Sequence, residues 1–294
     1  MKRIITLFIA LALLAVGAQA QLLWKVSGNG LPRPSYIFGT HHMAPASMID
    51  EVPGMQEAID GCDVVLGEIE KEALMSQEAQ ARMAQAMMAP ADSTLDKLYT
   101  KPQYAIVERV FNKYFSTMGV KLSQMNMLKP NAISTQMQAM QAIKYFSDFD
   151  SNNVIDMAVQ TRANDEGKPS GGLETVDDQI NLLFNTPLTE QAEGLLEACK
   201  KDDTFQEQSQ ALSDAYKTQD LDRIFAVMTD GTTGDSEAEM ERLIYSRNRN
   251  WVEKLKLIMP ERAALVCVGA GHLPGEQGLL QLLRNAGYKV EPVK

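Results

Sequence analysis

The three histidines of this 294-residue chain lie in two short glycine-rich segments, one near each end of the chain. Each segment is an apolar run followed by Gly-x-x-His, with Gly39 and His42 in the first copy and Gly269 and His272 in the second. Imidazole is the commonest metal ligand in proteins and the usual acid or base near neutral pH. The repeated arrangement therefore indicates that two distant strand ends meet to build one site.

Glycines and carboxylates near these histidines suit a reactive site. Gly39, Gly269 and Gly271 let the chain turn sharply after a strand and let backbone amides approach a ligand. Glu68 and Glu70 end another apolar run, two positions apart, and so point to the same side of a strand. A carboxylate beside a metal-bound water can act as a general base. Taken singly, a strand-end histidine is more often a structural residue, and a glutamate pair is usually a solvated rim.

The segments that carry these residues are typical of strands in a parallel sheet. Residues 62–70 begin as an almost continuous apolar run, as expected for a strand covered on both faces. Strands and helices alternate at both ends of the chain, which predicts an α/β fold with a central, mainly parallel sheet. Sites in such sheets form at the carboxyl ends of the strands. Both Gly-x-x-His turns and Glu68 fall at this edge.

A long helical region is expected to interrupt the sheet. Glycine almost vanishes between residues 71 and 150, where Ala, Gln, Met, Leu and Lys dominate, and these are strong helix formers. We expect a large Met-rich insertion of several helices over one edge of the site, with methionine filling the helical core. A flexible apolar groove for a peptide, or a copper(I) site at Met125 and Met127, is the alternative. Further helices are expected over 154–164, 189–216, 221–228 and 237–258, with a loop over 231–236.

The first 20 residues have the pattern of a signal peptide. Lys2 and Arg3 precede an apolar run over 4–16, and Ala18-Gln19-Ala20 is a small-x-small cleavage site. The apolar run is shorter than the roughly 20 residues that span a bilayer. We therefore expect residues 21–294 to form a single exported domain, periplasmic or secreted, with no membrane span.

Charge and cysteine content narrow the partners and the redox chemistry. The formal net charge is −10, which argues against nucleic acid and anionic lipid as partners. The three cysteines, Cys62, Cys199 and Cys267, allow at most one intramolecular disulfide. We expect Cys62 and Cys267 to be buried small side chains, with a bridge between them as the alternative if their strands are neighbours. The oligomeric state stays open.

Taken in order, these segments resemble the TraB/GumN family, to which the Tiki metalloproteases are similar. The resemblance spans nearly the whole mature chain, and the first and last of its segments are the most distinctive. Related folds include the erythromycin esterase and a haem-binding lipoprotein family, so the scaffold hosts different chemistries. The segments are LWKV (23–26), SYIFGTHH (35–42), DVVLGEIE (63–70), GLET (172–175), RN (247–248) and VGAGHLPG (268–275).

The resemblance implies a metal-dependent site and a role for each matching residue. His42, His272 and Glu68 would hold a divalent metal, namely manganese, cobalt or zinc. Glu68 or Glu174 would take a proton from the metal-activated water, and Arg247 would stabilise an oxyanion or a substrate carboxylate. Cleavage of a peptide or protein substrate is the implied reaction. There is no His-Glu-x-x-His helix, so the chain is no ordinary zincin.

One position departs from the family pattern, and one rival hypothesis remains. The residue before the aligned histidine is usually apolar in the family but is His41 here. We expect His41 at the rim or behind the ligands, together with Glu70 and Asn248, because successive residues at a strand end point in different directions; a second ligand or a proton shuttle is the alternative. The rival hypothesis is a non-catalytic binding module for haem, metal or peptide.

Overall fold

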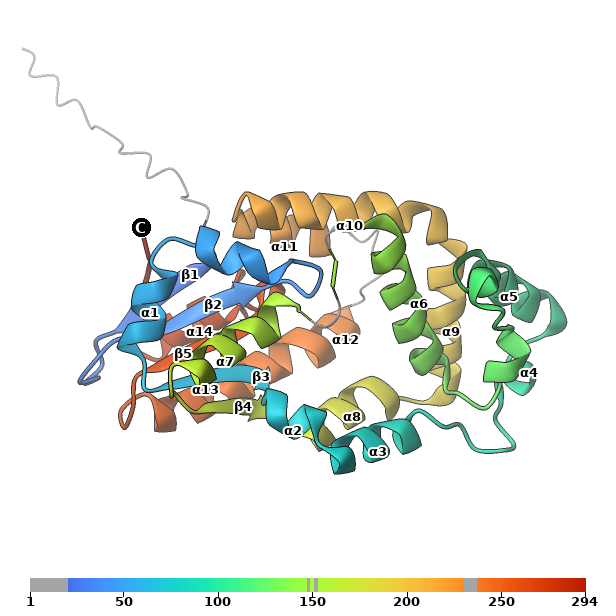
Figure 1. The fold of residues 1–294 in the computed structure, drawn as a ribbon, viewed down its shortest axis with the longest axis horizontal. Helices are drawn as coiled ribbons and strands as arrows, with labels where there is room; N and C mark the ends of the chain where they lie inside the picture. Colours follow the sequence, from blue (N-terminus) through green and yellow to red (C-terminus); the bar gives the residue numbers. More distant parts are fainter. Residues whose placement is uncertain (1–20, 147–148, 151–152, 230–236) are drawn as a thin grey trace, which may run out of the picture.

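A six-stranded sheet forms the centre of the protein (Figure 1). The computed structural model describes residues 21–294 except 147–148, 151–152 and 230–236, so the expected signal peptide and the expected 231–236 loop lie outside the described residues. The strands are β1 Leu23–Ser27, β2 Ser35–Thr40, β3 Val64–Ile69, β4 Ser170–Glu174, β5 Ala264–Gly269 and β6 Lys289–Pro292.

The sheet is mainly parallel, which confirms the expected α/β class. Its order is β4-β3-β5-β2-β1-β6, and the first four strands in this order are parallel neighbours. Only β1 runs antiparallel to its neighbours, β2 and β6. Four carboxyl ends therefore meet at one edge, although the strands come from distant parts of the chain.

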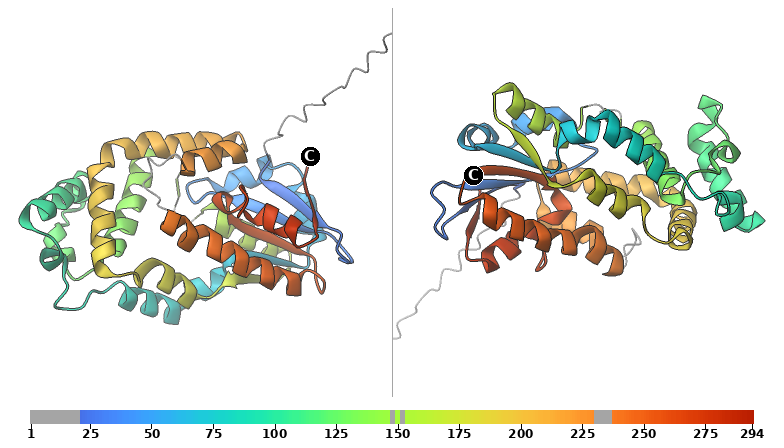
Figure 2. Two further views of the ribbon diagram at one scale, coloured as in Figure 1. Left: turned by 180° about the vertical axis from the view of Figure 1, so that it is seen from behind. Right: turned by 90° about the horizontal axis from the view of Figure 1, so that it is seen from below.

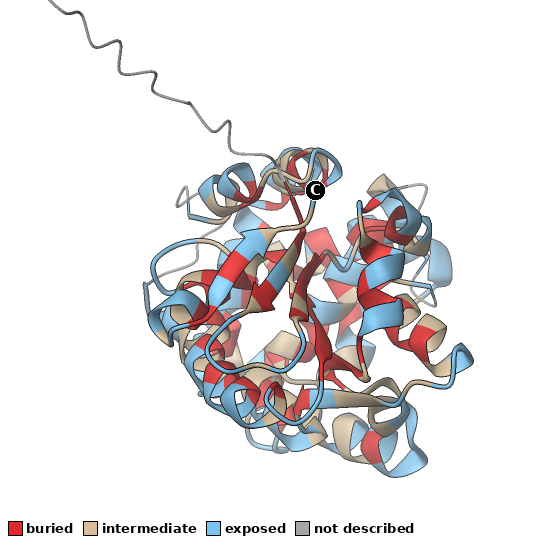
Figure 3. Ribbon diagram, turned by 90° about the vertical axis from the view of Figure 1, so that its left-hand side faces the viewer, coloured by how far each residue is buried: buried red, intermediate tan, exposed pale blue. Residues whose placement is uncertain are grey.

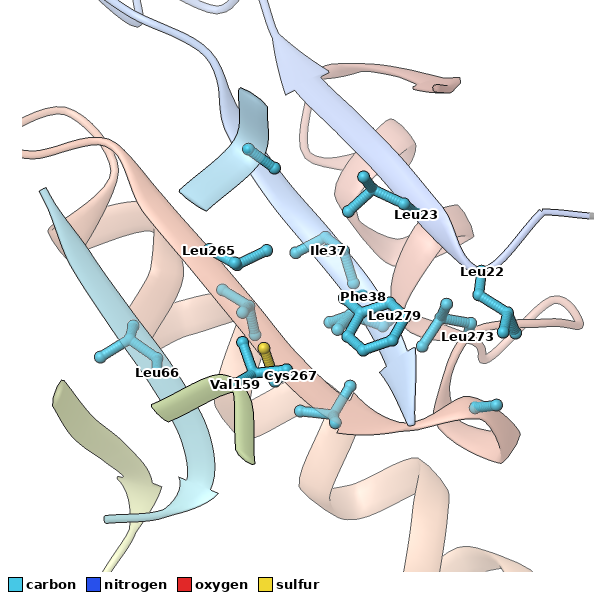
Figure 4. Packing of buried hydrophobic residues seen from close by; sticks show 14 of the residues in the cluster. Leu22, Leu23, Ile37, Phe38, Leu66, Val159, Leu265, Cys267, Leu273 and Leu279 are labelled. Atoms are coloured by element: carbon cyan, nitrogen blue, oxygen red, sulfur yellow. The ribbon is translucent and has the colours of Figure 1, made fainter. Parts of the chain in front are cut away.

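Helices cover both faces of the sheet and exclude water from its central strands. Helices α1 (Met55–Gly61) and α7 (Ile155–Asp165) lie over one face, and α13 (Ser246–Ile258) and α14 (Leu279–Asn285) over the other (Figure 2). Buried residues concentrate in the strands and on the helix sides that face them (Figure 3). Phe38, Leu265 and Val159 belong to this core (Figure 4).

The remaining helices extend the molecule beyond the carboxyl edge of the sheet (Figure 1). The expected insertion is helical, and a second long helical segment follows β4. The first segment contains α2 Lys71–Met75, α3 Gln77–Ala86, α4 Leu95–Leu98, α5 Lys101–Phe115 and α6 Pro130–Tyr145. The second contains α8 Val176–Phe184, α9 Leu188–Lys200, α10 Asp202–Lys217, α11 Leu221–Thr229 and α12 Glu237–Met240.

These two helical segments share a second hydrophobic core. Phe111 of α5 and Ile133 of α6 are fully buried and belong to one cluster with Leu195 of α9. The insertion is therefore completed by a helix that comes much later in the chain. Methionine is only partly core: Met137 lies in this cluster, whereas four others are exposed, namely Met75, Met88, Met118 and Met127.

The structure bears on the expected state of the cysteines and on the expected lack of a membrane span. Cys62, Cys199 and Cys267 are buried and free. In the β3–β5 register Gly67 lies opposite Cys267, so Cys62 is well displaced along the neighbouring strand and the alternative Cys62–Cys267 bridge is not formed. In the part of the chain that the structure describes, no helix combines the length and the apolar character that crossing a bilayer requires.

Two glycines lie opposite each other on β3 and β4 beside the site, and neither position has room for a side chain. Gly67 lies opposite Gly172. A Cβ at Gly172 would lie 2.7 Å from the carbonyl oxygen of Glu174 and 2.8 Å from the amide nitrogen of Glu70. The space at Gly67 is filled by the buried Gln160, whose amide donates to the carbonyl of Ile69 (3.1 Å). The end of β3 is thereby held fixed.

The close approach makes Gly172 and Gly171 a matched pair for substitution. Gly172→Ala is expected to lower the free energy of unfolding by about 1–3 kcal/mol, because backbone atoms must move. Gly171→Ala should have a smaller effect, because its Cβ would meet only the mobile Cδ2 of Leu66 at 3.1 Å. Urea unfolding of both variants measures the difference, and equal losses would contradict this account.

Candidate active site

A pocket of about 260 Å³ opens at the carboxyl edge of the parallel strands. It is lined by residues from the end of β2 and the turn after it, the end of β3, the 3₁₀ turn η5 (Ala270–His272) after β5, and α13. Residues of α10, of α11 and of the turn before α13 complete the lining. The sequence therefore predicted correctly which strand ends meet. The polar side chains that line the pocket are Thr40, His41, His42, Glu68, Tyr216, Arg247 and His272.

Arg247 is the centre of the hydrogen-bond network in the site. Its Nε and Nη2 donate to the two carboxylate oxygens of Glu174 at 2.7 and 2.9 Å, and Nη2 also donates to Glu68 Oε2 at 2.5 Å. Its Nη1 donates to the carbonyl of Leu243 (3.0 Å) and to His272 Nε2 (3.2 Å). All five N–H groups of the guanidinium are thus engaged. The arginine joins the ends of three strands, β3, β4 and β5.

Arg247 is positioned by the irregular turn that precedes α13 and by a tryptophan one turn further along this helix. A π-helical turn, Glu241–Tyr245, directly precedes α13, and such turns shift the phase of the helix that follows. The indole of Trp251 is fully buried beneath the guanidinium, with 4.7 Å from the ring centroid to Arg247 Cζ. Trp251 Nε1 also donates to Glu174 Oε1 at 3.0 Å. Trp251 therefore contacts both Arg247 and its carboxylate partner Glu174.

The two carboxylates beside Arg247 are both largely buried. The side chains of Glu68 and Glu174 are 17% and 10% exposed. Burial raises the pKa of Glu68, but the interactions with His272 and Arg247 outweigh this effect, so the pKa lies below its ordinary value. Glu68 Oε1 accepts in addition a hydrogen bond from the backbone amide of Gly269 at 2.9 Å. The first glycine of the second Gly-x-x-His motif therefore contacts the acid at the end of β3.

His272 is a buried, neutral imidazole with a defined tautomer. The amide nitrogen of Asn248 donates to the carbonyls of His272 (3.0 Å) and Gln277 (2.9 Å), so its Oδ1 must accept the proton of His272 Nδ1 (2.7 Å). The lone pair of Nε2 then faces Arg247 and lies 3.9 Å from Glu68 Oε1. Burial lowers the pKa of His272 to about 4.

His42 differs from His272 in both exposure and charge. Its Nδ1 lies 3.1 Å from Asp156 Oδ2, and the other oxygen of Asp156 accepts a hydrogen bond from Thr40. The charge of Asp156 raises the pKa of His42 to about 9. The His42 side chain is 74% exposed, so water weakens this attraction without reversing it. His42 therefore favours the charged form, whereas His272 favours the neutral form.

The remaining residues expected near the site lie in different surroundings. His41 lines the pocket; its Nε2 lies 3.5 Å from Ser213 Oγ and its ring contacts Tyr216. Burial lowers the pKa of His41 to about 4. Glu70 is the residue before helix α2, beyond the end of β3, and does not line the pocket. Strand β3 ends at Ile69, so the strand alternation from which a shared orientation of Glu68 and Glu70 was expected does not extend to Glu70.

The donor atoms do not fit the metal site implied by the family resemblance. Within the described ranges, no group of three or more histidine, cysteine, aspartate or glutamate side chains is arranged to hold a metal ion. Arg247 donates to both Glu68 and His272, and Asp156 binds His42. A metal at these three residues would require the guanidinium to leave two of its acceptors, so the divalent metal stays a prediction.

Sequence reasoning missed two residues that complete the site. Asp156 orients His42 from the first turn of α7 and is 114 positions away, and no local pattern links the two. Trp251 had a usable signal, since it follows Arg247 by four positions on a helix, where side chains are neighbours. Its role still depends on Glu174, which only the fold brings to the same place.

The fold and the site define an α/β protein whose paired Gly-x-x-His turns and central arginine meet at the edge of a parallel sheet. The sequence model of the TraB/PrgY/gumN family matches residues 22–292. The chain belongs to this family. Comparisons with curated proteins and with solved structures gave no match.

The His42–Asp156 pair should make stability depend on pH in a defined direction. Because the folded-state pKa of His42 is raised, its stabilisation is present below pH 6.5 and is lost as the pH rises through about 9. The effect should stay below about 1 kcal/mol, because the ring is exposed. Asp156→Asn should reduce this loss between about pH 6 and pH 10 in urea unfolding, whereas Asp165→Asn, at an exposed position of α7, should not. Identical pH profiles for all three proteins would contradict the pairing.

Proposed function

We propose that this protein is an exported hydrolase that cleaves amide bonds of peptide substrates in the pocket at the carboxyl edge of the sheet. The observation that carries the proposal is the convergence of Glu68, His42, His272 and Arg247 on one pocket of about 260 Å³. These groups come from segments far apart in sequence, and each is held by hydrogen bonds to buried partners or to the sheet edge. Membership of the TraB/PrgY/gumN family supports the proposal, and export rests on the pattern of the first 20 residues.

Glu68 is the general base of this proposal. It takes a proton from a water molecule while the water oxygen forms a bond to the carbonyl carbon of the substrate. The carbonyl π electrons move onto the oxygen. Glu68, Glu174 and Arg247 together carry a net charge of −1, which becomes zero when Glu68 is protonated. The positive charge of Arg247 is then available to stabilise the new oxyanion.

His42 is the general acid. When the carbon–nitrogen bond breaks, the leaving amine takes a proton from His42 and the oxyanion collapses to the carboxyl product. Asp156 favours the protonated imidazole before this step. Glu68 then returns its proton to solvent, and His42 regains one. Groups whose environments favour opposite protonation states are the usual basis of such an assignment.

Glu174, His272 and Asn248 position the reacting groups in this scheme. Glu174 Oε2 accepts from Gln179 as well as from Arg247, and Oε1 accepts from Trp251 and Arg247. These four hydrogen bonds, and its absence from the pocket lining, favour a supporting role over the alternative role of base. His272 orients the guanidinium through Nε2, and Asn248 fixes the tautomer of His272.

Glu68→Gln is the most direct test of the proposed reaction. The amide keeps the shape of the side chain but cannot take the proton, so kcat on unfolded fluorogenic casein should fall by about 10²–10⁴-fold with little change in KM. Glu253→Gln, the same change at an exposed position of α13, should retain activity. Undiminished hydrolysis by a folded Glu68→Gln protein would exclude this role. No hydrolysis by the wild type would favour the rival binding module.

Metal removal distinguishes the arrangement in which Arg247 binds Glu68 and His272 from the metal site that the family resemblance implies. Because Arg247 occupies Glu68 and His272, we expect hydrolysis to survive dialysis against EDTA. Loss of activity that manganese, cobalt or zinc restores would instead show that the guanidinium gives way to a metal. Metal content by mass spectrometry, with His42→Ala/His272→Ala as the reference, identifies the ion in that case.

A further inference from the structure

A much larger cavity, of about 950 Å³, lies among the helices beyond the carboxyl edge of the sheet. Helices α6, α9 and α10, which lie near one another in Figure 1, contribute residues to its wall. Its wall also includes residues of α11 and α12. The two helical segments of the chain thus enclose a space of their own, in addition to sharing a hydrophobic core.

This cavity adjoins the active-site pocket. Leu212 of α10 and Met228 of α11 line both spaces. Met228 packs directly on the second Gly-x-x-His turn, since a Cβ at Gly271 would lie 2.4 Å from its sulfur. A ligand that extends from the pocket into the cavity therefore contacts these two apolar side chains.

Charged side chains line part of the cavity wall, and another part of the wall suits a polypeptide backbone. The side chains of Gln138 and Gln208 line this second part, and neither forms a side-chain hydrogen bond with a described residue. Each carboxamide offers donors and an acceptor, which is what the alternating N–H and C=O groups of an extended chain require. Phe205 and Val227 add apolar surface between the polar groups.

We propose that the helical cavity is an extended subsite that binds the flanking residues of a long, unfolded polypeptide whose reacting bond lies in the pocket. The inference rests on the proposed function and narrows its substrate class from peptides in general to extended chains. A short peptide would occupy the pocket alone. A longer one would gain binding energy from the cavity without any change at the reacting groups.

Gly194 provides a selective way to block the subsite. It lies within α9, it lines the cavity, and a Cβ there would meet no atom within 4 Å. Gly194→Trp therefore fills cavity space from a position that tolerates a side chain. Gly194→Ala is the matched control, since it makes the same backbone change without filling the cavity. Neither variant touches the residues of the pocket.

The experiment uses nested, fluorescently labelled peptides of one unstructured mixed sequence, from about 3 to about 12 residues, which span roughly 10–40 Å when extended. Binding is followed by anisotropy and cleavage by chromatography. For the wild type and Gly194→Ala, Kd and KM should fall by roughly tenfold or more with length. For Gly194→Trp this gain should vanish, while kcat/KM for the shortest cleaved peptide stays within about twofold of the wild-type value.

The outcomes separate the subsite from the reaction. Length-dependent binding that Gly194→Trp abolishes, without cleavage by any variant, would support the subsite and overturn the proposed hydrolase. Cleavage that does not depend on peptide length would contradict the subsite but not the proposed hydrolase. Cleavage with the same length dependence in Gly194→Trp as in the wild type would lead to the same conclusion. A uniform loss at every length, with retained folding, would also contradict the subsite.

Discussion

The charge of Arg247 between two buried carboxylates is the interaction on which the site depends. Glu68 and Glu174 end neighbouring parallel strands, so without a cation their charges would repel in a poorly solvated place. The guanidinium satisfies both, and its own five donors are all engaged. Removing one partner of such a buried pair generally costs about 3–5 kcal/mol, because the other charge is left uncompensated. The sheet edge and α13 are therefore linked electrostatically as well as by packing.

Much of the nearby structure serves to keep this arrangement in place. Gly172 lets β4 lie close against the end of β3, where the carboxylates of Glu68 and Glu174 meet one arginine. Trp251 supports the guanidinium from below and donates to Glu174. Arg247 also donates a hydrogen bond to Nε2 of His272. This hydrogen bond fixes the second Gly-x-x-His turn relative to β3. The first Gly-x-x-His turn is held by a different contact, between His42 and Asp156, and the His42 side chain is exposed to solvent.

The helical part of the molecule gives the small pocket its wider surroundings. Two segments, one before β4 and one after it, must both fold before the second hydrophobic core and the large cavity exist. The pocket alone is small, and the adjoining cavity is several times larger. Chemistry at the sheet edge and recognition among the helices are thus assigned to different layers of one fold, which agrees with the view that scaffolds of this kind carry different reactions.

The sequence by itself determined the α/β class, the mainly parallel sheet, the helical character of residues 71–145 and the meeting of the two Gly-x-x-His turns, because these follow from local periodicity and from the common edge of parallel strands. Only the tertiary structure decided which side chains pair with one another in the site. Arg247 meets Glu68 across 179 positions and His42 meets Asp156 across 114. Such pairs depend on strand order, on the phase of α13 and on the close approach of β3 and β4, and none of these is a local property of the chain.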